Sequence, residues 1–382
     1  MPLSAPLASC LTRLGAPGGR PVAAPSSMFA ARGCGQGPDL MTTAHRRGGP
    51  PDSAVPGAAW DVMPHRVSQG QAQEFLAGKY GAVGELRPLG GGFWSSAYSF
   101  SHAGRELVLR FGANKDWFEA DRAALAFASP DLPVPEVAEV GEAFDGAYAI
   151  SVRCYGINLE DVRPDQSDAA GPMLASLLAA LFRVPKNSDL PVGWHWRPPR
   201  RDLTWRGWLS ERLVDDPRQE VHGWRAALAV QSGIDRVYRA AEARVRDLIE
   251  ACPERRDLIH GDLLHANVLV AEDAGRPNAV FSWKRSLRGD FLFDTAWCTF
   301  CSAIWYPGIA AAGPWDRVRR EPSMRDDAGA WIDAPVRHHC YELHIGLTAL
   351  AWNVWAGDSE ALQQVATQLA VVLERGPLPA DA

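Results

Sequence analysis

The stretch HGDLLHANVLV, residues 260–270, together with AVFSWKRSLRGDFLFDTAW, residues 279–297, decides the fold of this chain. The first stretch places Asp262 and Asn267 five positions apart on a short loop that His260 introduces. In phosphoryl transfer to a hydroxyl, a carboxylate orients or deprotonates the acceptor, and a neighbouring amide oxygen coordinates magnesium on the phosphates. The pattern predicts Asp262 as catalytic base, Asn267 as metal ligand and His260 as structural support. The structural alternative is a turn in which Asp and Asn bond nearby backbone.

Composition limits the class of protein. The chain has 382 residues, 47% of them hydrophobic, which is enough for two domains or for one bilobal domain with a substantial core. A net charge of -6 and a pI near 5.9 argue against a nucleic-acid binder with a basic surface. No run approaches the roughly 20 apolar residues that cross a bilayer, and the start lacks the apolar core of a signal peptide. We expect a globular, cytoplasmic monomer without nucleic-acid or membrane partners.

The seven cysteines are odd in number and irregularly spaced, which favours free thiols over a disulfide framework. Cys298 and Cys301 form a CxxC pair. The surrounding segment is typical of a buried helix and no second ligand pair lies nearby, so zinc or redox chemistry is the less favoured interpretation.

The two ends of the chain differ in composition from its centre. Residues 1–64 are rich in Ala, Pro and Gly and lack periodicity, which predicts a disordered extension. Met63 is therefore a second candidate for the functional start. Helical periodicity begins at residues 68–80, where Ser68 is a suitable N-cap. Residues 377–382 are expected to form a flexible tail.

The central part divides into a β-rich and a helical lobe. Residues 65–152 carry five strand-like runs and one main helix near 116–129, which predicts a small antiparallel sheet. Residues 153–376 are mainly helical, with segments near 171–183, 204–213, 220–251, 290–305, 335–356 and 358–374. The predicted fold class is α+β with two lobes.

Several segments resemble the aminoglycoside phosphotransferase family: LIHGDLLHANVLV, RGDFLFDTAW, GRELVLRFGANKDWFEADR, LPVPEVAEVGEAF, ACPERRDLIHGD and HIGLTALAWNVWAGD. The resemblance covers most of residues 68–360 and implies a bilobal protein-kinase-like fold with ATP bound between the lobes. It also implies transfer of the γ-phosphate, with Mg²⁺, to a hydroxyl of a small acceptor. The implied acceptor is a cationic aminoglycoside such as hygromycin B, or a related metabolite.

The resemblance assigns further site residues. The turn expected to cover the nucleotide phosphates holds Gly90, Gly91 and Gly92. A plain hairpin turn is the other interpretation of this cluster. Arg110 holds the position of the basic residue that contacts nucleotide phosphates, and a surface arginine is its alternative. Asp121 on the following helix is the preferred ion-pair partner, with Glu119 as second choice, because helical phase does not decide between them.

Asp290 and Asp294 match the family pattern where a helix begins. An aspartate near a helix N-terminus stabilises exposed backbone donors and interacts favourably with the helix dipole. We expect both to brace the catalytic loop.

The second stretch departs from the family at one position. Alignment through Trp283 places Ser282 where relatives carry a metal-binding aspartate. Magnesium prefers six oxygen ligands, and its main protein ligand in kinase-like sites is a carboxylate. Each loss of about 1.36 kcal/mol in transition-state stabilisation lowers the rate about tenfold, so an uncompensated Ser282 predicts activity lower by orders of magnitude.

Three compensations are considered, in order of preference. Asn267 holds the ion with phosphate and water ligands alone, Asp290 moves in, or Lys284 and Arg285 supply positive charge. A solvated turn is the other interpretation of these two basic residues. The alternative function is a degenerate kinase-like protein that binds nucleotide or a small molecule without turnover.

Two acidic segments are candidates for facing a cationic acceptor: NLEDVRPDQSD (158–168) and LVDDPRQE (213–220). Solvated loops are the other interpretation. Four tryptophans are candidates for stacking on sugar rings, although core packing is favoured: Trp194, Trp196, Trp205 and Trp208.

Overall fold

The computed structural model describes residues 66–89, 95–186, 203–219, 221–325 and 327–379. These residues all belong to one compact unit. The predicted disordered extension at residues 1–64 lies outside the described part of the chain.

Helix α2 (Gln69–Tyr80) begins where the sequence predicts a helix. Ser68 Oγ accepts a hydrogen bond from Gln71 N, and Gln71 Oε1 accepts one from Ser68 N at 2.9 Å. This reciprocal pair satisfies two backbone donors that the start of a helix leaves open. The buried residues Ala72 and Leu76, one turn apart, pack α2 against the neighbouring sheet.

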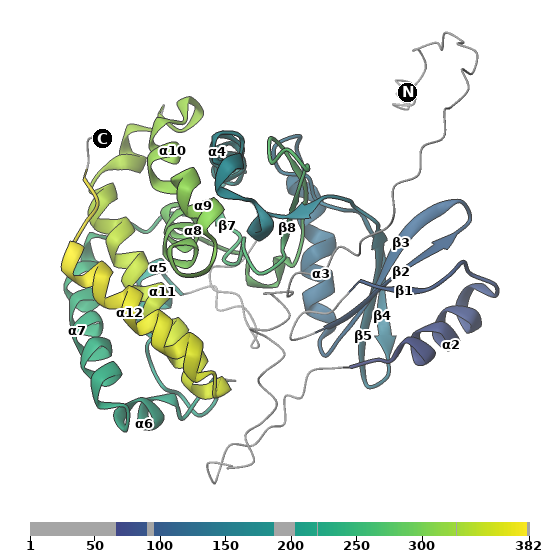
Figure 1. Cartoon of the computed structure of the whole chain (residues 1–382), viewed down its shortest axis with the longest axis horizontal. Helices are drawn as coiled ribbons and strands as arrows, with labels where there is room; N and C mark the ends of the chain where they lie inside the picture. Colours follow the sequence, from purple (N-terminus) through teal and green to yellow (C-terminus); the bar gives the residue numbers. More distant parts are fainter. Residues whose placement is uncertain (1–65, 90–94, 187–202, 220, 326, 380–382) are drawn as a thin grey trace, which may run out of the picture. The chain divides into compact units, whose positions relative to one another are not determined.

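Five antiparallel strands form the predicted sheet, in the order β1-β2-β3-β5-β4 (Figure 1). Their bounds are Arg87–Pro88 (β1), Ser95–His102 (β2), Arg105–Gly112 (β3), Val137–Ala143 (β4) and Gly146–Val152 (β5). Phe144 and Asp145, which join β4 to β5, both have positive φ. Such a turn matches the right-handed twist of the paired strands.

The two faces of this sheet carry different side chains, because successive residues of a strand point to opposite sides. Leu109 and Phe111 of β3 lie in the apolar layer under α2. Arg110 between them faces α3 (Lys115–Ala124), which covers the other side (Figure 1). The two helices that the sequence predicts in this lobe, α2 and α3, therefore cover opposite faces of the sheet.

Helices dominate the chain after β5, as predicted. Those that follow the predicted segments are α4 (Ser167–Arg183), α5 (Trp205–Glu211), α8 (Leu292–Trp305), α11 (Ala334–Ala356) and α12 (Ser359–Arg375). The single helix predicted at 220–251 is two helices, α6 (Trp224–Ala229) and α7 (Ser232–Leu248). The backbone of Gln231, with φ -98° and ψ 69°, is not helical and separates them.

Two further helices, α9 (Pro307–Ala312) and α10 (Pro314–Arg320), lie where no helix is predicted. Both begin with a proline. The missing N–H of proline is tolerated in the first turn, where a helix has no acceptor for it. Proline thus starts these helices rather than preventing them.

Short strands frame the two motif loops. β7 (Asp257–Ile259) pairs with β10 (Leu287–Gly289), and β8 (Val268–Val270) lies between β6 (Ile157–Asn158) and β9 (Pro277–Val280). The loop 260–267 therefore joins β7 to β8, and the loop 281–286 joins β9 to β10. The 3₁₀ segments are Leu125–Phe127, Leu159–Asp161 (η2), Pro164–Gln166, Ile249–Ala251, Trp283–Arg285 (η5), Pro322–Met324 and Ala328–Trp331.

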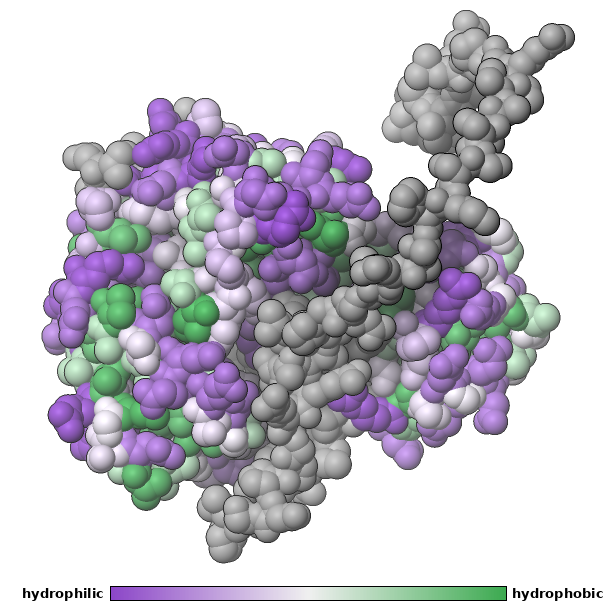
Figure 2. Space-filling view, in the orientation of Figure 1, coloured by the Kyte–Doolittle hydropathy of each residue, from purple (hydrophilic) through white to green (hydrophobic). Residues whose placement is uncertain are grey.

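The core of the helical part is organised around α11, which contacts α7, α8 and α12. Leu343 and Leu347 of α11 are fully buried. On the surface seen in Figure 2, apolar side chains form small separate groups among hydrophilic ones. Among the described helices, none is long and apolar enough to cross a membrane.

Candidate active site

The loop 260–267 is anchored at its start by a carboxylate from α8. Asp294 accepts hydrogen bonds from His260 N at 2.7 Å and from Gly261 N at 2.8 Å. Gly261 has φ +76°, and a Cβ there would lie 2.7 Å from the backbone oxygen of Arg285. Glycine is thus needed both for the backbone conformation and for the close approach of the second loop. Asp294 braces the catalytic loop, as expected from the sequence.

His260 joins the two motif loops. Its ring is fully buried, Nε2 donates to Phe281 O at 3.1 Å, and Nδ1 accepts from Asp262 N at 3.2 Å. Burial lowers the pKa of His260, which keeps the ring neutral with one donor and one acceptor nitrogen. His260 therefore has the supporting role that the sequence suggests.

Asp262 is held as a carboxylate. Its Oδ1 accepts a hydrogen bond from His265 Nδ1 at 2.7 Å. Burial alone would raise the pKa of Asp262, but the charge of His265, its hydrogen bond and the charge of Arg285 lower this pKa to about 2. The same contact raises the pKa of His265 against the opposing effect of burial. His265 lies within the quoted motif three positions after Asp262, yet its role was not recognised from the sequence.

Asn267 is oriented by its own loop. Nδ2 donates to the carbonyl oxygens of Asp262 and Leu264, both at 2.8 Å. Because these two bonds use the amide nitrogen, Oδ1 is the end of the side chain left for a ligand. These bonds are the backbone contacts that the turn alternative predicts, and they leave Oδ1 in position to serve as the predicted metal ligand as well.

The second loop carries an unusual backbone at Ser282. This residue has φ +67° and ψ 50°, the left-handed region that few non-glycine residues adopt. Trp283 N, the next donor along the chain, is bound by Asp121 Oδ1 at 2.7 Å. A contact from α3 therefore fixes the loop at the residue after Ser282.

Arg110 and Asp121 form an ion pair, with 2.5 Å between Arg110 Nη2 and Asp121 Oδ2. Glu119, the second choice, instead pairs with Arg122 on the same helix. The predicted partner is thus confirmed. Only 17% of the Arg110 side chain and 5% of the Asp121 side chain are exposed, so this pair is more strongly coupled than a surface salt bridge.

The structure bears on two of the proposed compensations for Ser282. Asp290 does not brace the catalytic loop, which corrects the prediction. Its carboxylate is fully buried and accepts hydrogen bonds from Arg337 Nε at 2.8 Å and from Tyr341 Oη at 2.7 Å. It is therefore held on α11 and not available to move. Lys284 Nζ lies 4.6 Å from the ring centroid of Trp117, a cation–π contact that holds this ammonium against α3. Arg285 meets no such objection, since its charge acts on Asp262.

These residues do not by themselves fit a magnesium site. Asn267 offers one amide oxygen, but Ser282 offers a neutral hydroxyl where a bridging carboxylate is expected. No group of three or more His, Cys, Asp or Glu side chains within the described ranges is arranged to hold a metal ion. Any divalent cation would therefore depend mainly on oxygen ligands that come with the nucleotide.

The other predicted site residues have diverse positions. Gly90, Gly91, Gly92, Trp194 and Trp196 lie outside the described residues. Trp205 and Trp208 are buried and stack on each other with centroids 5.1 Å apart, which confirms core packing. Asp215 accepts from Gly223 N at 2.6 Å and so supports the start of α6. Cys298 and Cys301 are buried in α8, and burial raises the pKa of both thiols.

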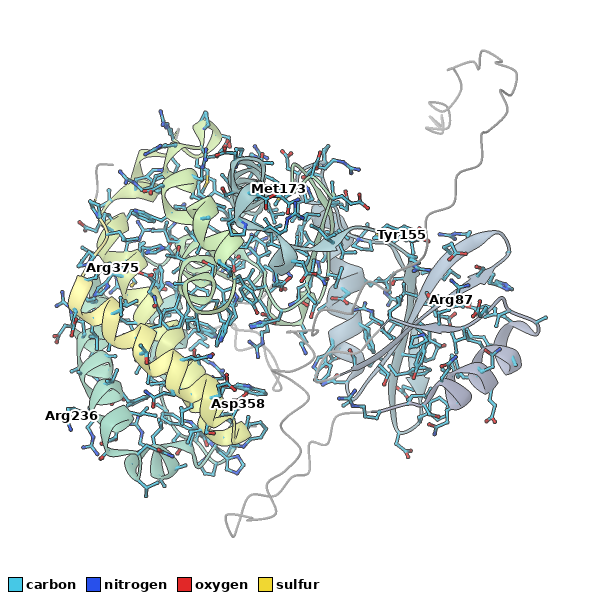
Figure 3. The ribbon with its side chains drawn as sticks, in the orientation of Figure 1. Arg87, Tyr155, Met173, Arg236, Asp358 and Arg375 are labelled. Atoms are coloured by element: carbon cyan, nitrogen blue, oxygen red, sulfur yellow. The ribbon has the colours of Figure 1, made fainter. Side chains whose placement is uncertain are left out.

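Glu160 is a residue of the acidic segment 158–168 whose position the sequence did not reveal. It is buried in η2, and its Oε1 accepts a hydrogen bond from Ala266 N in the catalytic loop at 2.5 Å. Tyr155, which is labelled in Figure 3, is an exposed residue of the segment between the end of β5 and η2. The acidic segment is thus partly a structural element of the site and not only a solvated loop.

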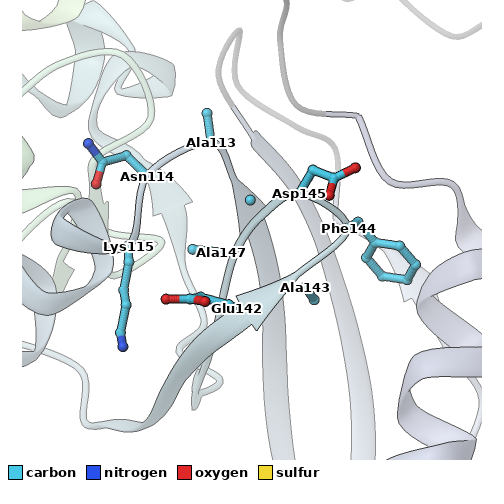
Figure 4. Close-up of a pocket in the computed structure, with 9 residues that line it drawn as sticks. Ala113, Asn114, Lys115, Glu142, Ala143, Phe144, Asp145 and Ala147 are labelled. Carbon is cyan, nitrogen blue, oxygen red and sulfur yellow. The ribbon is translucent and has the colours of Figure 1, made fainter.

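One hollow of the described structure lies away from this chemistry. It has a volume of about 510 Å³ and lies between the start of α3 and the β4–β5 turn (Figure 4). Asn114, Lys115, Glu142 and Asp145 supply its polar lining. None of the predicted catalytic or metal-binding residues contributes to it.

Comparison with known proteins agrees with this geometry. Residues 85–322 match the model of the phosphotransferase enzyme family. The chain belongs to this phosphotransferase family. It is 31% identical over 296 residues to hygromycin-B 4-O-kinase of Escherichia coli, covering 75% of this chain and 80% of that enzyme.

Solved structures of this phosphotransferase family have the same fold. A thermostable mutant of aminoglycoside phosphotransferase APH(4)-Ia, in ternary complex with AMP-PNP and hygromycin B, superposes with a TM-score of 0.65 at 27% identity, covering 81% of this chain and 99% of that one. A second APH(4)-Ia structure gives a TM-score of 0.65 at 26% identity, covering 81% of this chain and all of that one. The predicted bilobal protein-kinase-like fold is confirmed.

Proposed function

We propose that this phosphotransferase moves the γ-phosphate of ATP to a hydroxyl of a small cationic acceptor, an aminoglycoside such as hygromycin B. The observation that carries the proposal is an ionised, buried Asp262 beside an oriented Asn267 on one loop. The relationship to hygromycin-B 4-O-kinase supports the acceptor class. A metabolite of similar chemistry is the competing acceptor.

Asp262 is proposed to orient the acceptor hydroxyl. His265 occupies Oδ1, so Oδ2 is the oxygen that receives the hydroxyl hydrogen bond. With a pKa of about 2, Asp262 is a weak base. It aligns the hydroxyl in the ground state and accepts the proton only as the bond to phosphorus forms and the hydroxyl becomes acidic.

Arg110 is proposed to hold the nucleotide phosphates. Asp121 accepts from one of its terminal nitrogens, which fixes the guanidinium plane and leaves further N–H donors of the fork for phosphate oxygens. The same Asp121 carboxylate accepts from Trp283 N, so the arginine and the Ser282 loop are oriented by one group.

Magnesium is proposed to accompany ATP with Asn267 Oδ1 as its protein ligand. Ser282 supplies no charge to that ion. The second candidate function, nucleotide binding without turnover, is favoured by the same serine.

Acceptor-dependent ATP consumption separates the two functions. The purified chain is incubated with ATP, at several magnesium concentrations, with hygromycin B, with a panel of other aminoglycosides, or without acceptor. Consumption that requires an acceptor supports the transferase. Saturable nucleotide binding without consumption, in both the natural chain and Ser282→Asp, would support the binding protein instead.

A further inference from the structure

The catalytic loop contains two successive residues in the left-handed backbone conformation. His265 has φ +64° and Ala266 has φ +59°, and neither is glycine. This conformation is unfavourable for residues with a Cβ and persists only when surrounding contacts enforce it. The strained pair lies between Asp262 and Asn267, the two residues to which the chemistry is assigned.

One contact to this pair comes from a distant part of the chain. Glu160 of η2 accepts the hydrogen bond from Ala266 N at 2.5 Å across 106 positions of sequence. The carboxylate is buried, and its other oxygen, Oε2, has no hydrogen-bond partner among the described atoms. Burying a carboxylate for two backbone donors, its own N–H and that of Ala266, is costly, and the bond to Ala266 is the one that reaches the catalytic loop.

A second contact acts on the neighbouring residue. The ring of His265 bonds Asp262 Oδ1 and lies edge-on to Trp297 of α8, with centroids 5.9 Å apart. The orientation of the peptide group between His265 and Ala266 affects the direction of the His265 side chain and the position of the Asn267 backbone. A group that fixes Ala266 N therefore acts on both functional residues.

We propose that Glu160 is a positioning residue of the catalytic loop, which holds the left-handed His265–Ala266 pair and through it the orientation of Asp262 and Asn267. This inference rests on the proposed phosphotransferase function for its effect on rate. The dependence of the loop conformation on Glu160 does not require any substrate. Glu160 touches no reacting atom in this account.

Matched substitutions test the two halves of the argument. Glu160→Ala removes the acceptor, whereas Glu160→Gln keeps an amide oxygen that can accept from Ala266 N. Ala266→Gly removes the backbone strain that Glu160 is proposed to hold, because glycine adopts positive φ readily. Glu272→Ala is the control, since Glu272 is an exposed carboxylate in the β8–β9 turn.

We expect kcat to fall in Glu160→Ala and to recover when Ala266→Gly is added. Glu160→Ala lowers kcat about tenfold or more with a smaller change in the KM for ATP, because misplacement of catalytic groups acts mainly on the chemical step. Glu160→Gln stays within about threefold of the natural chain. Adding Ala266→Gly to Glu160→Ala restores most of the loss. Equal kcat values for Glu160→Ala and Glu272→Ala, or no recovery by Ala266→Gly, would overturn the inference.

Amide hydrogen exchange provides the readout that does not need turnover. In the free protein, Glu160→Ala should increase exchange within residues 260–267 while α11 and α12 keep their protection. Unchanged exchange in that loop contradicts the positioning role. An inactive natural chain whose loop responds as described would instead remove the proposed function and leave this inference standing.

Discussion

Asp121 joins Arg110 to Trp283: one carboxylate oxygen accepts from Arg110 Nη2 at 2.5 Å and the other from Trp283 N at 2.7 Å. Arg110 belongs to the sheet, and Trp283 follows the serine that replaces the expected metal ligand. The position of the basic residue and the backbone of the Ser282 loop are therefore coupled through a single buried side chain.

Removal of Asp121 should affect both stability and nucleotide binding. Asp121→Ala leaves the mostly buried Arg110 and the Trp283 N–H without their partner, which should lower the free energy of unfolding by about 3 kcal/mol or more. The KM for ATP should rise at the same time. Urea unfolding and steady-state kinetics measure the two effects. Glu119→Ala is the control, and a similar loss of stability there would contradict the assignment.

Replacement of Ser282 by aspartate should strengthen magnesium binding. Asp tolerates the left-handed backbone better than most residues, so φ +67° adds little strain. A carboxylate at this position should lower the magnesium concentration for half-maximal nucleotide binding about tenfold or more. Titration calorimetry at varied magnesium measures it. Ser282→Asn is the control, because asparagine has the size of aspartate but no charge. It should change the free energy of magnesium-dependent nucleotide binding by less than half as much as Ser282→Asp. Equal effects of the two variants would disprove a charge-based explanation.

Glu160 should make stability depend on pH. Burial raises its pKa in the folded state to about 7, above the ordinary value of 4.5. The folded protein thus retains a proton that the unfolded chain releases. This contribution to stability is fully present below pH 4.5 and is lost as the pH rises to about 7, with a size on the order of 3 kcal/mol.

Chemical unfolding of the natural chain and Glu160→Gln across this pH range tests the linkage. Between pH 4.5 and 7 the unfolding free energy of the natural chain should fall relative to that of Glu160→Gln by about 3 kcal/mol. The variant is therefore favoured at the higher pH. A pH-independent difference would contradict the raised pKa.

Arg337 should be essential for folding stability. Its guanidinium is buried and binds both oxygens of Asp290, so Arg337→Ala leaves an uncompensated buried charge. The expected loss is about 3–5 kcal/mol in the free energy of unfolding. Arg236→Ala, an exposed arginine on α7 (Figure 3), should change it by less than about 0.5 kcal/mol. Comparable losses for the two variants would be inconsistent with this account.

The chemical motif could be predicted because it is local. Asp262 and Asn267 lie five positions apart on one short loop, where spacing in sequence constrains spacing in the fold. The α2 cap could be predicted for the same reason. An antiparallel sheet followed from alternation and turn residues, but the strand order, with β5 between β3 and β4, did not.

Contacts between distant segments were beyond the sequence patterns. Helical phase did not choose between Asp121 and Glu119, because the choice depends on how α3 lies against β3. Asp290 and Asp294 looked equivalent at a helix start, yet one binds α11 and the other the catalytic loop. Glu160 is 106 positions from Ala266, and no local pattern links them.

The most direct test of the central claim compares the natural chain with Asp262→Asn in a product assay with ATP and hygromycin B. Phosphorylated acceptor is detected by mass spectrometry, and nucleotide affinity is measured in parallel. We expect transfer by the natural chain and a fall in kcat of about a hundredfold or more in the variant, with nucleotide affinity unchanged. Equal transfer by both proteins would contradict the role assigned to Asp262.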